Sequence, residues 1–161
     1  MTDYWAKEEA TIEKVKEALL SLGEVLQETE AIGIFGSLAR GEGFTEHSDI
    51  DVFVVVKEVK PGFETDDLWY RRVREVLRKF WRGVTVLVYT VRDLEAISNW
   101  HVLRLAVEGI LVYDQGGIGK LFEEIIEAAE KAGLEQRRIR DRWVWTIKDM
   151  KPGQVVEVKV R

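Results

Sequence analysis

The spacing of apolar and polar residues predicts four helices. Apolar residues recur every three or four positions along four stretches, which is typical of helices that bury one face: 3–29, 65–81, 91–108 and 118–132. Gly23 interrupts the first stretch, so we expect that helix to end early.

Short apolar runs between these helices are typical of buried strands. They predict strands at 31–35, 49–56, 84–90 and 110–113. This order of elements favours one domain, residues 1–161, of the α/β (α+β) class, in which helices flank a small mixed β-sheet. We place its core at about residues 1–109. Residues 110–161 then form an extension with a C-terminal helix and a hairpin.

The pattern is weaker after residue 134. The basic run there predicts a short helix, and a hairpin should follow it. Its turn would be Lys151-Pro152-Gly153, because Pro-Gly is a strong turn signal.

Composition limits the sites that the chain can build. It has no Cys and only two His, His47 and His101, which excludes disulfides, thiolate metal sites and a zinc site made of His alone. Any metal should be a hard cation bound by oxygen. No apolar run reaches the length of a membrane helix, and residues 1–9 lack the features of a signal peptide. We therefore expect a cytoplasmic protein without a membrane partner.

The formal net charge of −5 argues against nucleic acid as a partner. Residues 131–161 differ, with nine Lys or Arg and four Asp or Glu, a balance of +5. Trp143 and Trp145 in this segment could stack on bases, but no RNA-binding motif accompanies them. A second basic group lies along the second predicted helix, and we interpret it as a solvated face: Arg71, Arg74, Arg78 and Arg82.

Residues 33–56, GIFGSLARGEGFTEHSDIDVFVVV, contain candidate phosphate-binding groups. Gly36 and Ser37 follow a strand and precede a turn or short helix. Gly lets a phosphate approach the backbone, and both the Ser37 hydroxyl and the helix-start amides can donate hydrogen bonds to it. Arg40 follows within about one turn and can add a charge-assisted contact.

The same stretch contains a candidate metal-binding pair. Asp49 and Asp51 flank Ile50 at the start of a strand, and side chains at i and i+2 of a strand point the same way. Two carboxylates at one spot repel each other unless a cation lies between them. Mg²⁺ (or Mn²⁺), held by the two carboxylates and substrate phosphates, is the expected cofactor, and the combination suits phosphoryl transfer.

This stretch resembles the minimal nucleotidyltransferases of the DNA-polymerase-β-like superfamily. Their signature is Gly-Ser, a small residue and Arg-Gly, then Ser-Asp-hydrophobic-Asp before an apolar strand. The chain supplies Gly36, Ser37, Ala39, Arg40, Gly41, Ser48, Asp49, Ile50 and Asp51 in that order. The resemblance implies the nucleotidyltransferase fold and transfer of a nucleoside monophosphate, AMP from ATP. It is close over these 24 residues and looser up to about Gly109.

The resemblance also assigns roles. Asp49 and Asp51 would be the catalytic, metal-binding pair, and the nucleoside triphosphate would be bound by Gly36, Ser37, Arg40 and Ser48. The acceptor would be a small helical partner protein, as in toxin–antitoxin modules, or a small molecule.

A third carboxylate is implied on the next strand, where we align Thr85. Thr cannot act as a general base near neutral pH. Asp93 or Glu95 could take its place, or the strand could align in another register. The alternative function is a catalytically weakened, antitoxin-like binding module that acts by contact with a partner protein.

Overall fold

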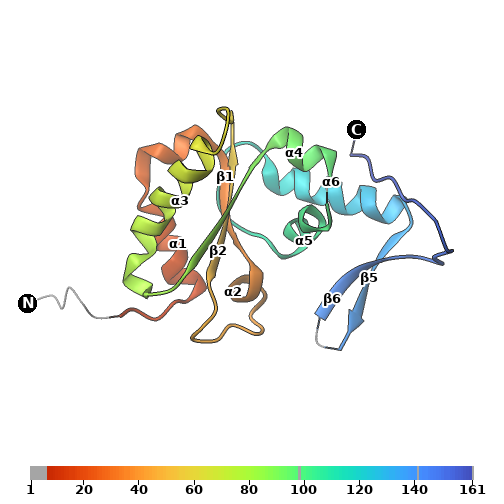
Figure 1. The fold of residues 1–161 in the computed structure, drawn as a ribbon, viewed down its shortest axis with the longest axis horizontal. Helices are drawn as coiled ribbons and strands as arrows, with labels where there is room; N and C mark the ends of the chain where they lie inside the picture. Colours follow the sequence, from red (N-terminus) through yellow and green to blue (C-terminus); the bar gives the residue numbers. More distant parts are fainter. Residues whose placement is uncertain (1–6, 98, 141, 161) are drawn as a thin grey trace, which may run out of the picture.

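A four-stranded mixed sheet forms the centre of the molecule (Figure 1). The computed structural model describes residues 7–97, 99–140 and 142–160. The strands are β1 (Thr29–Phe35), β2 (Ile50–Val56), β3 (Val84–Thr90) and β4 (Ile110–Asp114), in the spatial order β3-β2-β1-β4. β2 and β3 are parallel, and β1 is antiparallel to β2 and β4. The predicted fold class is confirmed.

Helices cover both faces of this sheet (Figure 1). One face packs against α1 (Ile12–Leu20), α3 (Glu64–Leu77) and the 3₁₀ helices η1 (Gly23–Glu28) and η2 (Arg78–Phe80). The other face packs against α4 (Val91–Ala96), α5 (Trp100–Glu108) and α6 (Ile118–Lys131). The short α2 (Gly36–Arg40) continues directly from β1. Among the described residues, no helix is both long and apolar enough to cross a membrane.

The side-chain alternation of β2 separates two hydrophobic cores. Ile50, Val52 and Val54 pack toward α1 and α3. Phe53 and Val55 pack toward α5 and α6. Asp51 lies on the same side of the strand as these two residues. Its carboxylate therefore faces the α5 layer.

Phe53 joins β1, β2 and α6. Its ring is fully buried, and its centroid lies 5.8 Å from that of Phe122. A Cβ at Gly33 of β1 would overlap this ring and would lie 2.5 Å from the Ile110 carbonyl oxygen. Gly33 therefore lets β1 pack closely between β2 and β4.

Two predicted helices are shorter than expected. The first begins only at Ile12, because the Thr11 side chain accepts a hydrogen bond from the Lys14 amide (3.2 Å), and it gives way to η1 at Gly23, whose φ is +68°. Residues 1–6 of the predicted helix lie outside the described residues. The second predicted helix ends in a 3₁₀ turn over its last residues.

The predicted helix at 91–108 is two helices. Ile97 has a left-handed φ of +44°, which ends α4. The Asn99 side chain then accepts a hydrogen bond from the Val102 amide (3.2 Å) and starts α5. Because of this break, α5 differs in direction from α4 and crosses the face of the sheet that carries Asp51.

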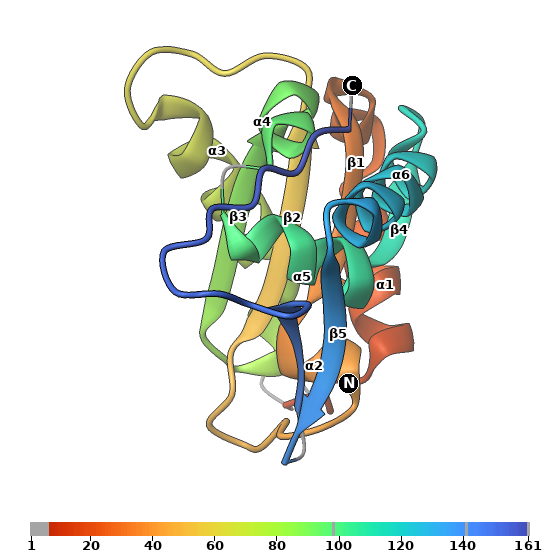
Figure 2. The ribbon, with the colours of Figure 1, turned by 90° about the vertical axis from the view of Figure 1, so that its right-hand side faces the viewer.

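The basic helix predicted after residue 134 was wrong. An antiparallel hairpin occupies this segment, made of β5 (Leu134–Ile139) and β6 (Arg142–Ile147), with Ile139 paired to Arg142. It lies beside α2 and α5 (Figure 2). The hairpin expected at Lys151-Pro152-Gly153 was also misplaced. That segment forms a turn in which the Gln154 amide donates to the Lys151 carbonyl (3.1 Å), and no described strand follows it.

We expect Phe53→Ala to lower the free energy of unfolding by about 3–5 kcal/mol, because it removes a fully buried ring. Urea titration followed by circular dichroism measures this change. Phe63→Ala is the matched control, since that ring is 80% exposed, and it should shift the unfolding free energy by no more than about 0.5 kcal/mol. Equal losses in both variants would contradict the assignment of the core.

Candidate functional site

A tight turn links β1 to α2 at Gly36. Its φ is +74°, a backbone conformation in which a side chain would be strained. A Cβ there would also overlap the Asp51 carboxylate. The turn therefore brings the backbone of the Gly36-Ser37 pair directly against one of the two predicted metal-binding side chains.

Asp49 and Asp51 lie side by side at the start of β2, as their spacing predicted. Asp51 is paired across the sheet with Phe35 of β1 and with Thr85 of β3. Asp49 immediately precedes the strand, and a Cβ at Gly83 would overlap its carboxylate. The Thr85 hydroxyl donates a long hydrogen bond to Asp49 Oδ2 (3.4 Å). Thr85 therefore lies next to both carboxylates.

Burial raises the pKa of Asp51 above its ordinary value of 3.8. The Thr85 hydroxyl lowers this pKa and the negative charge of Asp49 raises it, while Arg40 lowers it. The net effect is a rise, so ionisation of Asp51 is unfavourable mainly because the side chain is buried, and repulsion from Asp49 adds to this cost. A cation between the carboxylates would relieve that repulsion. No group of three Asp, Glu or His among the described residues could hold a metal ion.

The loop between α2 and β2 is held by its own polar groups. The Ser48 hydroxyl accepts a hydrogen bond from the Thr45 amide (2.9 Å). Arg82 donates to the carbonyl oxygens of Thr45 (2.6 Å) and Ser48 (2.9 Å), and its guanidinium lies 4.2 Å from the centre of the Phe44 ring. Arg82 is therefore a structural clamp, and its interpretation as part of a solvated face was wrong.

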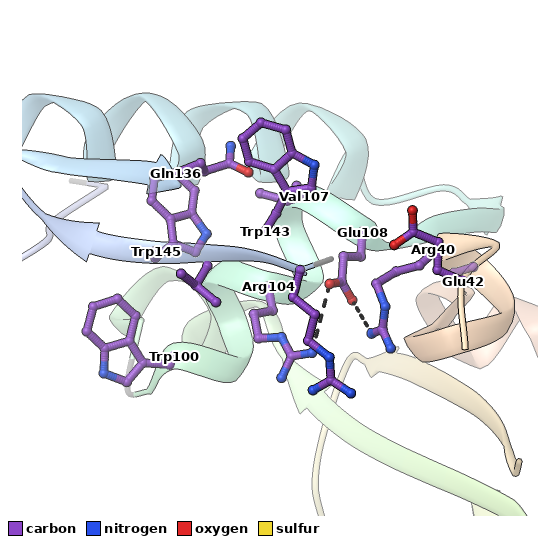
Figure 3. A pocket seen from close by; sticks show the side chains of 12 residues that line it. Arg40, Glu42, Trp100, Arg104, Val107, Glu108, Gln136, Trp143 and Trp145 are labelled. Atoms are coloured by element: carbon purple, nitrogen blue, oxygen red, sulfur yellow. Dashed lines mark hydrogen bonds and ion pairs between the residues drawn. The ribbon is translucent and has the colours of Figure 1, made fainter. Parts of the chain in front are cut away.

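α5 contributes charged groups that the sequence motifs did not identify. Glu108 Oε2 lies 3.2 Å from Arg40 Nη1, and Glu108 Oε1 lies 3.9 Å from Arg104 Nη2 (Figure 3). The Glu108 side chain is only 15% exposed. The only sequence signal for it is its place at the end of a helix before Gly109, which indicates a helix terminus and no function.

A cavity of about 340 Å³ brings these groups together, a volume within the range of small-molecule sites. Five of the predicted site residues line it: Gly36, Ser37, Arg40, Asp51 and Thr85. α5 adds His101, Arg104 and Glu108. Asp49 is connected to this group through Thr85, whereas Ser48 lies in the loop that precedes β2.

Asp93 lies too far away to replace a carboxylate at Thr85. It accepts a hydrogen bond from the Thr90 amide (2.9 Å) in the capping box of α4, at the opposite end of β3. Thr90 lies five positions after Thr85 along the strand, which corresponds to about 16 Å. Glu95 lies further along α4. The replacement by Asp93 that we considered from the sequence is therefore wrong, whereas the replacement by Glu95 stays a prediction.

We expect Asp51→Asn to raise the melting temperature near neutral pH in metal-free buffer. The folded protein binds the Asp51 proton more tightly than the unfolded chain does, so ionisation of Asp51 costs stability as pH rises above 3.8. The gain should therefore shrink as pH falls toward 3.8. Differential scanning fluorimetry over this range measures it, with the exposed Glu46→Gln as control. A variant no more stable than the parent at pH 7 would contradict the strained carboxylate pair.

Several solved structures are similar to the chain at low identity. One is a chain from a crystal structure of a toxin–antitoxin with AMP-PNP. The two chains are 16% identical, the alignment covers 66% of this chain and 79% of the other, and the TM-score is 0.46. Another belongs to a tri-AMPylated Shewanella oneidensis HEPN toxin in complex with MNT antitoxin, with 13% identity over 75% and 87% of the two chains and a TM-score of 0.48. Each similarity is too loose to assign an activity. No curated protein matches the chain.

The family model described as nucleotidyltransferase domain matches residues 12–131. The match starts at the first residue of α1 and ends at the last residue of α6. It includes the whole central sheet and every residue of the candidate site. The chain therefore belongs to the nucleotidyltransferase domain family.

Proposed function

We propose that the chain is a metal-dependent nucleotidyltransferase of the minimal type that transfers AMP from ATP to an acceptor hydroxyl. Membership of the nucleotidyltransferase family supports the reaction class. The observation that carries the proposal is the pair of carboxylates beside the Gly36-Ser37 turn: Asp51 lies against Gly36 and lines the cavity, and Asp49 is linked to it through the Thr85 hydroxyl. Phosphoryl transfer needs these two features next to each other.

The chemistry of the pair fits Mg²⁺ (or Mn²⁺). Both side chains offer oxygen donors, and Asp51 has a raised pKa because burial and Asp49 disfavour its ionised form. Asp49 and Asp51 would hold the ion. When bound, it would neutralise charge on the triphosphate oxygens.

The neighbouring residues would bind and orient the triphosphate. The Ser37 hydroxyl and the amides that start α2 would donate hydrogen bonds to its oxygens. The Arg40 guanidinium has five N–H donors, so it can contact a phosphate while it remains paired with Glu108. In the transfer step the acceptor oxygen bonds to the α-phosphorus. The bond from this phosphorus to the oxygen that bridges it to the β-phosphorus breaks, pyrophosphate leaves with the bonding electron pair, and the acceptor hydroxyl releases its proton to water.

Thr85 decides between an efficient enzyme and a weakened one. We infer that Thr85 occupies the position of the third carboxylate, because it is paired with Asp51 across the sheet and its hydroxyl donates a hydrogen bond to Asp49. A neutral hydroxyl cannot take the acceptor proton, so transfer would be slow. The second candidate function follows from the same observation. It is an antitoxin-like module that binds a small helical partner protein without modifying it.

Asp49→Asn should reduce Mg²⁺-dependent pyrophosphate release from ATP by roughly 100-fold, the usual loss when one electrostatic group of a phosphoryl-transfer site is removed. A coupled colorimetric assay of pyrophosphate, with water as the acceptor, measures this rate. Asp66→Asn on α3 is the control, because it is an exposed carboxylate outside the cavity. Equal rates in the two variants would contradict the proposed role of Asp49 and Asp51 in binding the metal.

Thr85→Asp should raise the rate of pyrophosphate release by at least about tenfold, since a positioned general base contributes roughly 10²–10⁴-fold. Thr85→Asn is the control, because Asn has nearly the same shape as Asp but no charge, and it should not raise the rate. If Asp and Asn behave alike at this position, Thr85 is not the missing base. Contact with a partner would then be the better account of the fold.

A further inference from the structure

A second cavity, of about 730 Å³, lies between α5 and the β5–β6 hairpin (Figure 3). Arg40, Arg104 and Glu108 line both this cavity and the candidate nucleotide site, so the two spaces adjoin. We call the larger space the hairpin cleft. A group bound there could reach the cavity that contains Asp51.

The hairpin cleft runs along the free edge of β6. Four consecutive residues of this strand, 142–145, line the cleft. Gln136 of β5, which pairs with Trp145, also lines the cleft, so the cleft covers one face of the hairpin. Successive side chains of a strand point to opposite faces, so a cleft that also touches Arg142 and Val144 reaches the edge of β6. Within the described part of the chain, β6 pairs only with β5. Its other edge therefore offers backbone N–H and C=O groups to a further strand.

Aromatic and apolar side chains form the walls of the hairpin cleft. Trp100, Arg104 and Val107 line it at helical spacing along one face of α5. Trp143 of β6 is 57% exposed and Trp100 is 52% exposed. Large apolar side chains gathered on one open surface are typical of a site that binds a partner.

The charge of the hairpin cleft favours an acidic partner. Arg142 lines it and forms no ion pair with another described residue. The hairpin that carries it also has Arg138 and Arg140, and Arg137, which is paired with Glu135 (2.7 Å). Glu108 and Glu42 also line the cleft and offset the charges of Arg40 and Arg104, so Arg142 supplies the remaining positive charge of the lining. The chain as a whole has a net charge of −5, which disfavours the phosphate backbone of nucleic acid over any longer range. A short acidic peptide needs only this local positive surface.

We propose that the hairpin cleft binds an extended, acidic segment of a partner protein, which pairs as a third strand with β6. The Trp side chains would hold the apolar residues of the segment, and Arg142 would contact its carboxylates. This inference deepens the proposed function, because a hydroxyl side chain on such a segment would lie beside the candidate nucleotide site and serve as the acceptor.

Fluorescence anisotropy tests the binding without any transfer step. The probe is a labelled peptide of about eight residues, enough to span the strand, with Tyr or Val alternating with Asp or Glu. A peptide with Lys in place of the acidic residues is the reference. The acidic peptide should bind at least about tenfold more tightly. Equal binding, or tighter binding of a single-stranded DNA oligonucleotide, would overturn the proposal.

Two matched pairs of variants localise the binding. Trp143→Ala and Arg142→Glu should each weaken it by about tenfold or more, the effect of removing one important contact. Tyr70→Ala and Arg74→Glu are the controls, because both residues are exposed on α3, on the opposite face of the sheet. Equal effects in both pairs would show that the peptide does not bind in the hairpin cleft.

Backbone N-methylation of the peptide tests the strand pairing. Alternate amides of an added strand face its neighbour, so methyl groups in one phase should abolish binding and those in the other phase should be tolerated. Equal tolerance of both phases would exclude pairing with β6. Transfer of labelled AMP from ATP to the peptide is measured separately. Peptide binding without AMP transfer would support the hairpin cleft as a binding site and contradict the proposed transferase activity. Pyrophosphate release without peptide binding would support the transferase activity and contradict the proposed role of the cleft.

Discussion

Two carboxylates lie next to each other at the start of β2 because the backbone on either side of them carries no side chain. Gly36 makes room for Asp51, and Gly83 makes room for Asp49. Burial raises the pKa of Asp51, and the negative charge of Asp49 adds to this rise. Two neighbouring carboxylates favour the binding of a cation, because its positive charge offsets their mutual repulsion. Most of the site chemistry follows from this constraint.

The rest of the fold keeps these charges in place. β2 is buried on both faces, so its register fixes the direction of Asp51. Arg82 and Ser48 close the loop that leads to Asp49. Glu108 of α5 holds Arg40 and Arg104 in the lining of the cavity that contains Asp51. The arginines are thus positioned before any phosphate arrives, which reduces the entropy lost on binding.

The sequence predicted the parts in which local pattern and tertiary structure agree. The apolar run of β2 and the spacing of Asp49 and Asp51 placed two carboxylates on one side of a strand, as observed. The hairpin escaped prediction because its turn begins with Arg140, which adopts a φ of +58° without the usual Gly or Asn. Glu108 was missed because its role depends on how α5 crosses the sheet, and no local motif records that.

Calorimetric titration of ATP into the purified protein, with and without Mg²⁺, is the decisive test of a metal and nucleotide site at Asp49 and Asp51. Binding should require the metal and should disappear in the double variant Asp49→Asn/Asp51→Asn. Binding that persists without metal, or in the double variant, would contradict the proposed roles of the two carboxylates. Absence of ATP binding under every condition would contradict the nucleotide site itself and leave the chain as a partner-binding module.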